Sequence, residues 1–156
     1  MTGPSGPGES AGWDLEVRPH LMPRLAYVAA GLIAVAHILF ALLLKVKSSG
    51  VIFRTSDQVA IAVLGLIIAG AVLLFTRPRL RVGAAGLSVR NVLGDRLIPW
   101  PQVVGVSFPA GKRWARLDLP DDEYLPLVAI QSADKGRAVA AIEAVRALVG
   151  RYQSGA

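Results

Sequence analysis

The chain has 156 residues, of which 53 % are hydrophobic and 18 % are charged, with a formal net charge of +6 and a mean hydropathy of +0.50. That is too apolar for an ordinary soluble domain unless the apolar residues are gathered in a few segments. Cysteine is absent, which excludes disulfides, thiolate metal sites and cysteine nucleophiles.

The N-terminal segment, residues 1–24, is predicted to lie outside the folded part of the chain. Residues 1–12 hold Gly, Pro, Ser and Glu with almost nothing to bury, a composition typical of a disordered tail. Trp13, Leu15 and Val17 follow, and we expect them to rest among lipid headgroups because tryptophan is enriched at that depth.

Two uncharged apolar runs predict a transmembrane helical hairpin over residues 25–76. The first, Leu25–Leu44, has twenty residues, which as a helix cover about 30 Å of hydrocarbon. The second, Val59–Phe75, has seventeen residues and covers about 26 Å, and Thr76 extends it to 59–76. Two core helices of a soluble protein would lack partner surface in so short a chain. A signal peptide cleaved near Ala34 would still leave the second span.

The orientation of the hairpin follows from its basic residues. The connection from Lys45 to Gln58 is short, so both ends of the hairpin are predicted to lie on the same side of the membrane. Six basic residues flank the spans on that side and three lie in the connection: Arg18, Arg24, Arg77, Arg79, Arg81 and Arg90 against Lys45, Lys47 and Arg54. The positive-inside rule therefore places both termini in the cytoplasm.

Small residues mark the face on which the two helices are expected to meet. They recur at helical spacing together with His37 on the first span and Gln58 on the second: Ala26, Ala30, Ala34 and Ala41, then Ala62, Gly65 and Ala69. Counting depth from the cytoplasmic ends places His37 near Ala62 and Gly65. His37 is therefore the candidate intramembrane helix contact, and protonation or binding of a partner subunit is the alternative role for a histidine within a span.

After Arg77 the pattern changes to short alternating runs between turn residues, which is typical of antiparallel strands. The predicted strands are 79–82, 87–92, 96–100, 103–108, 114–119 and 124–131, with a turn at 83–86. A helical apolar stripe over 134–152 then predicts one amphipathic helix, begun by Ser132 or Asp134 and ended by Gly150, before a tail at 153–156. This helix is expected to cover one end of a small barrel or curled sheet.

The soluble part, residues 77–152, resembles a known family. The residues that carry the resemblance are Leu80–Val82, Gly86-Leu87, Arg96-Leu97-Ile98-Pro99-Trp100, and Val103, Val104 and Val106, followed by two strands and a helix. They look like the short bacterial pleckstrin-homology-like (PH) domains found behind two membrane spans in actinobacteria. The resemblance implies an antiparallel sheet or barrel of about six or seven strands with a C-terminal helix. It also implies a multi-pass protein of the bacterial plasma (inner) membrane that recognises a partner without catalysis.

Basic and aromatic residues are the candidate contacts of this domain. Arg79 and Arg81 flank the 83–86 turn, which itself has no Lys or Arg, so recognition of inositol phosphates as in eukaryotic PH domains is not expected. Lys112 and Arg113 precede Trp114 and Arg116 at the tip of a predicted hairpin, a combination suited to anionic headgroups or an acidic partner. An ordinary solvated hairpin is the equal alternative.

Catalytic and metal sites are not expected. Asp121, Asp122 and Glu123 form the one acidic run, but no histidine is near it, so we expect a solvated turn, with pairing to Lys112 and Arg113 of another copy as a hypothesis. His20 and His37 lie outside the predicted soluble fold, which excludes a Ser/His/Asp triad there. No phosphate-binding glycine loop or dinucleotide fingerprint is present, so no cofactor and no nucleic acid is expected.

These observations predict a non-enzymatic, membrane-anchored recognition or scaffold module that binds a protein partner, another membrane or membrane-associated protein. The alternative is a sensor of anionic lipids that uses Arg79, Arg81, Lys112 and Arg113. A membrane-bound enzyme is the third class, and the sequence supports it least.

Overall fold

The computed structural model describes residues 12–44 and 54–155. The chain divides into two compact units, Met1–Pro19 with Pro78–Ala156, and His20–Arg77. We call the first the sheet domain and the second the helical hairpin. The predicted tail at 1–12 and the connection at 45–58 lie largely outside the described residues.

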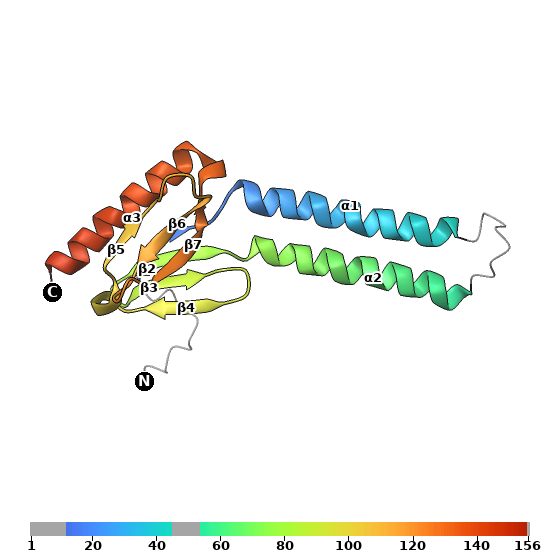
Figure 1. Ribbon diagram of the computed structural model, residues 1–156, viewed down its shortest axis with the longest axis horizontal. Helices are drawn as coiled ribbons and strands as arrows, with labels where there is room; N and C mark the ends of the chain where they lie inside the picture. Colours follow the sequence, from blue (N-terminus) through green and yellow to red (C-terminus); the bar gives the residue numbers. More distant parts are fainter. Residues whose placement is uncertain (1–11, 45–53, 156) are drawn as a thin grey trace, which may run out of the picture. The chain divides into compact units, whose positions relative to one another are not determined.

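The helical hairpin consists of α1 (Leu21–Leu43) and α2 (Thr55–Leu73), and a short 3₁₀ helix, η1 (Leu74–Thr76), continues α2 (Figure 1). Both are long and apolar enough to cross a membrane. Only 17 % of the most apolar stretch of α1 and 11 % of that of α2 are buried, whereas the core helix of a soluble protein is mostly buried. Their exposed Leu, Ile, Val and Phe side chains suit a lipid environment.

Small residues line the contact between α1 and α2. Those that are buried are Ala26, Ala30 and Ala41 of α1, and Gly65 and Ala69 of α2. The side-chain amide of Gln58 donates a hydrogen bond to the Ala41 carbonyl oxygen over 2.8 Å, which joins the helices across their contact. Close approach of the backbones gives these helices van der Waals contact where no hydrophobic effect is available.

The sheet domain has seven antiparallel strands in two sheets (Figure 1). Sheet A has the order β1-β2-β3-β4, with β1 (Trp13–Val17), β2 (Arg79–Gly83), β3 (Gly86–Arg90) and β4 (Asp95–Ile98). Sheet B has the order β5-β6-β7, with β5 (Gly105–Ser107), β6 (Trp114–Asp118) and β7 (Tyr124–Gln131). Short 3₁₀ helices lie at Trp100–Gln102 and Ser132–Asp134. The sheets are separate, so the fold is an open sandwich and not a closed barrel.

Strand β1 differs from the sequence expectation, which placed Trp13, Leu15 and Val17 among headgroups. Leu15 lies opposite Val82 and Val17 opposite Leu80, and both side chains pack on the core of the sheet domain. Apolar and polar side chains alternate along β1, so one of its faces is apolar. Pairing with β2 satisfies the backbone N–H and C=O groups of β1. The sheet domain is therefore built from chain on both sides of the helical hairpin.

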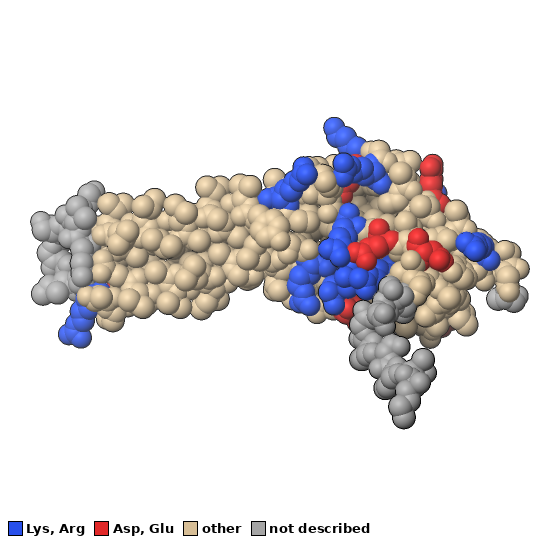
Figure 2. Space-filling view, turned by 180° about the vertical axis from the view of Figure 1, so that it is seen from behind, with Lys and Arg blue, Asp and Glu red and all other residues tan. Residues whose placement is uncertain are grey.

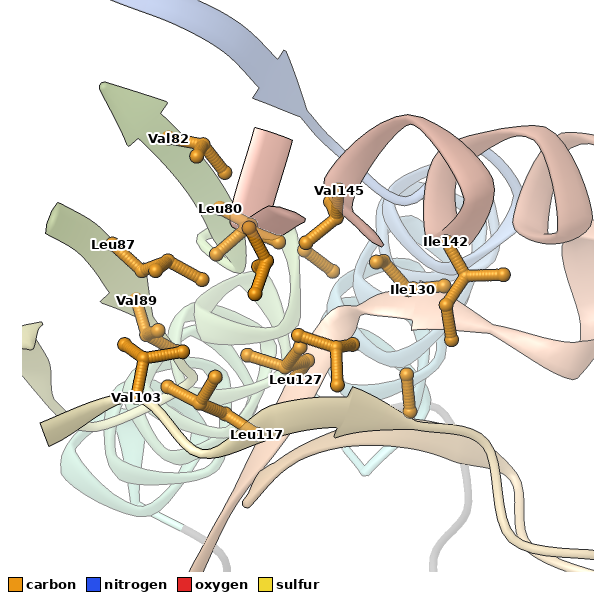
Figure 3. Close-up of a cluster of buried hydrophobic side chains, with 14 of the residues drawn as sticks. Leu80, Val82, Leu87, Val89, Val103, Leu117, Leu127, Ile130, Ile142 and Val145 are labelled. Atoms are coloured by element: carbon orange, nitrogen blue, oxygen red, sulfur yellow. The ribbon is translucent and has the colours of Figure 1, made fainter. Parts of the chain in front are cut away.

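The core lies between the sheets and a terminal helix, α3 (Gly136–Ser154) (Figure 3). Leu80, Val82, Leu87 and Val89 point inward from sheet A, Leu117, Leu127 and Ile130 from sheet B, and Ile142 and Val145 from α3. Residues at alternate strand positions share this face, as the period of two requires. In β7 an irregularity opposite Trp114 and Ala115 breaks this period, so Ile130 faces the core as well as Leu127.

Helix α3 continues through Gly150 to Ser154, beyond the predicted end, because contacts of its last turn hold it. Gln153 donates to the Val103 carbonyl oxygen over 2.7 Å, and Tyr152 stacks on Trp100 with ring centroids 4.7 Å apart. Its N-cap is Lys135 in a left-handed conformation, φ 48°, so the expected capping by Ser132 or Asp134 side chains is not the arrangement seen.

Candidate functional site

An arginine-rich surface covers the outer face of sheet A. Its members lie on the side opposite the core: Glu16, Arg18, Arg79, Arg81, Arg90 and Asp95. Glu16 accepts from Arg18 over 2.6 Å and from Arg81 over 2.7 Å, and Asp95 accepts from Arg90 over 3.0 Å. Figure 2 shows basic side chains gathered on the sheet domain with acidic ones among them. Four arginines face two carboxylates, so the surface keeps an excess of positive charge.

Arg79 is the arginine of this surface that has no carboxylate partner among the described residues. It has no ion pair with any residue in the described part of the chain, and it lies opposite Arg90 on the neighbouring strand. Partial burial and then the charges of Arg81 and Arg90 lower the pKa of Arg79. Burial acts to raise the pKa of Glu16, but hydrogen bonds from Arg81 and Arg18 outweigh it, so that pKa lies below its ordinary value.

A second surface, which we call the tryptophan face, is the outer side of sheet B. Trp114 and Arg116 of β6 and Tyr124 of β7 point away from the core, and the two aromatic residues are 43 % and 62 % exposed. The Arg116 guanidinium lies 5.4 Å from the centroid of the Tyr124 ring. It also pairs with Asp118 over 2.7 Å and donates to the Ser107 hydroxyl over 3.0 Å, so its charge is already satisfied.

Lys112 and Arg113 border the tryptophan face at the β5–β6 hairpin. Both are exposed, and neither forms an ion pair with a described residue. Together with Trp114, Arg116 and Tyr124 they line a groove of about 440 Å³, whose remaining walls are Pro109, Gly111 and Pro126.

The sequence alone suggests that the basic residues form one surface, but in the structure they lie on two different faces. Arg79 and Arg81 lie on the outer face of sheet A, while Trp114 and Arg116 lie on the outer face of sheet B. The core lies between these sheets, so the two faces point away from each other. A single ligand therefore cannot touch both.

A third surface is an apolar groove of about 510 Å³ between the β3–β4 hairpin and β7. Its walls include Val89, Val92, Leu93, Leu125, Pro126 and Val128. Leu93 at the hairpin turn is 84 % exposed. Leu97 on β4 is 53 % exposed, but it lies opposite Ser88 on the outer face of sheet A and not in the walls of the groove. Sequence reasoning missed this site, although a leucine beside Gly94 in a solvated turn was a signal that could have found it.

The groove is fixed at its end by Asn91. Its side-chain amide donates to the Pro126 carbonyl oxygen over 2.9 Å, and its side-chain oxygen accepts from the Val128 backbone N–H over 3.4 Å. These bonds tie the β3–β4 hairpin to β7, so the apolar groove is pre-formed.

His37 lies where α1 meets α2. A Cβ added at Gly65 would lie 2.3 Å from the His37 Cβ, so the imidazole occupies the space that this glycine leaves. Its Nδ1 hydrogen-bonds with the Ile33 carbonyl oxygen of its own helix over 2.8 Å. His37 is placed as a helix contact with its ring nitrogen satisfied locally.

No group of three or more His, Cys, Asp or Glu that could hold a metal ion occurs among residues 12–44 and 54–155. Asp121 and Asp122 form the exposed tip of the β6–β7 turn, with φ of 60° and 57°.

Two packed antiparallel sheets with a terminal helix define the PH-like class of domain. Residues 77–148 match the family model of the bacterial PH domain, and the chain belongs to that family. Two relatives are "Uncharacterized protein Rv1417" of Mycobacterium tuberculosis and "Uncharacterized protein Mb1452" of Mycobacterium bovis. Each is 66 % identical over 141 residues, which cover 90 % of this chain and 92 % of the relative. No solved structure matches the chain significantly.

Proposed function

We propose that this protein is a non-enzymatic, membrane-anchored recognition module that binds an extended segment of a protein partner along the free edge of β4. The observation that supports this proposal is an open strand edge beside a pre-formed apolar groove. None of the described strands pairs with the outer edge of β4.

The pairing of the β3–β4 hairpin decides which backbone groups are free. Asn91 donates to the Gly94 carbonyl oxygen over 2.8 Å, and Arg90, Val89 and Ser88 lie opposite Asp95, Arg96 and Leu97 in turn. Bonded and non-bonded pairs alternate in antiparallel sheets. The N–H and C=O groups of Asp95 and Leu97 therefore point to the open side, where an added strand would bond them.

The side chains around this edge indicate the chemistry of the partner. Leu93, Leu97 and the apolar groove suit Leu, Ile, Val or Pro side chains of an added strand. Arg96 lines the groove without an ion pair to a described residue, whereas Asp95 is held by Arg90. An apolar segment with an acidic residue is the best fit.

A non-enzymatic role agrees with the placement of the polar groups. Catalytic groups usually lie in water-excluded clefts with strongly shifted pKa values. Within residues 12–44 and 54–155, no polar or charged residue is buried. A domain tethered by two spans also has a high effective concentration towards other membrane proteins, which favours such a protein as the partner.

The test uses the full-length protein in cells, with a photo-crosslinking residue in place of Leu93. We expect one discrete cross-linked product, which is lost when Leu97→Pro is added, because proline removes the outward N–H and blocks strand addition. The same residue in place of Val139 on α3, 56 % exposed, is the control. Equal products from both positions, or a Leu93 product that survives Leu97→Pro in a folded domain, would contradict the proposal.

A second candidate function is recognition of anionic lipids by the arginine-rich surface, and the unpaired Arg79 favours it. Each basic residue near an anionic membrane contributes about 1 kcal/mol. The test is lipid retention by the full chain in nanodiscs of mixed charge, read by native mass spectrometry. Loss of retained anionic lipid with Arg79→Gln, but not with Arg137→Gln on α3, would support it, and equal retention would exclude it.

A further inference from the structure

The tryptophan face has opposite charges at its two ends. At the start of β6 stand Lys112 and Arg113, and after its end comes the turn Asp121-Asp122-Glu123. Seven residues separate Arg113 from Asp121, namely the five of β6 and then Leu119 and Pro120. The five strand residues alone span roughly 17 Å at the usual rise per residue. None of the five charged side chains has an ion pair with a described residue.

The middle of the face between these ends is neutral and aromatic. Arg116 is matched by Asp118, which leaves the exposed rings of Trp114 and Tyr124 and the half-buried Pro126 as uncharged groups of this face. Tryptophan and tyrosine are the residues that contribute most at the centres of protein interfaces. An aromatic centre with charged ends has the anatomy of an interface core and rim.

The acidic end is held in one conformation. Asp121 and Asp122 both have left-handed backbone angles, and the Leu119 N–H donates to the Glu123 carbonyl oxygen over 2.9 Å across the turn. This two-residue turn projects its carboxylates from the end of the hairpin. The turn therefore loses little conformational entropy when a basic side chain of another molecule binds to it.

We propose that two copies of this chain pair through the tryptophan face about a twofold axis. A strip that is positive at one end and negative at the other is complementary to itself when one copy is turned by 180°, because each basic hairpin then meets the acidic turn of the other. Trp114 and Tyr124 of the two copies meet at the centre. The free edge of β4 belongs to the other sheet, so pairing leaves this edge open, and Pro126 is the residue that lines both the tryptophan-face groove and the apolar groove.

The first experiment exchanges charges in the full chain, with two differently tagged copies co-expressed and purified in mild detergent. Variant one carries Lys112→Glu and Arg113→Glu. Variant two carries Asp121→Asn, Asp122→Asn and Glu123→Lys, in which asparagine tolerates the left-handed turn. Expressed alone, variant one has a tryptophan face that is negative at both ends, and variant two has one that is positive at both ends. We therefore expect the self-association of each variant to weaken at least about tenfold.

Mixing variants one and two restores opposite charges at both contacts, so we expect co-purification to recover to near the parent level. The Arg137→Glu variant on α3 is the control for a change of charge elsewhere and should associate like the parent. A monomeric parent, unchanged self-association of either variant, or failure of the mixture to recover would overturn the proposal.

The second experiment depends on geometry and remains informative if a charge variant fails to fold. The chain has no cysteine, so one copy is given Lys112→Cys and the other Glu123→Cys, and membranes containing both are oxidised. The twofold arrangement predicts a disulfide between the different copies and none between two Lys112→Cys copies. Equal cross-linking within and between the two types, or none at all, would contradict it.

Discussion

Trp100 joins three parts of the sheet domain through one side chain. Its indole N–H donates to the carbonyl oxygens of Gly83 and Ala84 over 3.0 and 3.1 Å, and its ring stacks on Tyr152 of α3. The turn after β2, the corner after β4 and the last turn of α3 are thereby held together.

We expect Trp100→Phe to keep most of the ring packing and to lose the two hydrogen bonds, at a cost of about 1 kcal/mol of unfolding free energy. Trp100→Ala removes the ring as well and should cost about 3–5 kcal/mol. Denaturant unfolding in detergent, followed by circular dichroism of the sheet domain, measures both. Equal losses for the two variants would show that the hydrogen bonds dominate.

Glu16 makes the stability of the sheet domain depend on pH. Its folded-state pKa lies below the unfolded value, so the unfolded chain binds more protons in acid. Its contribution is fully present above the ordinary glutamate pKa of about 4.3, and it is lost as the pH falls through the lower folded-state value.

The Glu16→Gln variant should therefore be less stable than the parent at neutral pH, and the difference should narrow as the pH falls below about 4.3. Unfolding midpoints of the variant and the parent, measured from pH 7 to 3, give this difference in stability at each pH. Glu143→Gln on α3 is the matched control, because Glu143 has no ion pair with a described residue. A constant difference between Glu16→Gln and the parent would contradict the expectation.

At the scale of the element, local pattern determined the later strands well. Strands β2 to β7 lie within the predicted segments or within one residue of them, because their alternation coincides with pairing between neighbours in sequence. Strand β1 shows the same alternation, but its partner β2 comes after the helical hairpin. A pairing at that distance leaves no local turn signal, so the sequence pattern alone predicts an interfacial segment in place of β1.

The candidate site was only partly predictable for the same reason. Sequence alone gives Arg81 no partner, but β1 brings Glu16 beside it. In sheet B, Asp118 and Ser107 bind Arg116 in the same way. The sequence showed which residues carry charge. Which of them remain unpaired, and on which face, depends on the three-dimensional pairing of strands.

The contact between α1 and α2 gives a prediction at this scale. Gly65→Ala places a methyl group within 2.5 Å of two His37 atoms, and such overpacking should cost about 1–3 kcal/mol. Gly70→Ala on the same helix meets nothing within 4 Å and is the control. Unfolding of the helical hairpin by SDS in mixed micelles compares them. Equal stability of the two variants would contradict this contact.

For the whole molecule, the expected orientation places both ends in the cytoplasm. An alkaline phosphatase fused after Ala156 should stay inactive, and a green fluorescent protein there should fluoresce. The same reporters inserted at Ser49, in the connection between the spans, should give the opposite pair of results. An active phosphatase at the C-terminus would reverse the orientation.

Because β1 is made before both spans and β2 after them, sheet A cannot be completed during early synthesis. Val17 of β1 can pair with Leu80 of β2 only after both helices have been made. In a chain inserted into a bilayer, the two strands lie on the same side only if the chain between them crosses the bilayer an even number of times. A chain that inserts only one of the two helices leaves β1 and β2 on opposite sides of the bilayer. Strand β2 then keeps an unpaired edge, and such edges promote aggregation. In a chain that crosses a bilayer, completion of sheet A therefore requires that both helices are inserted.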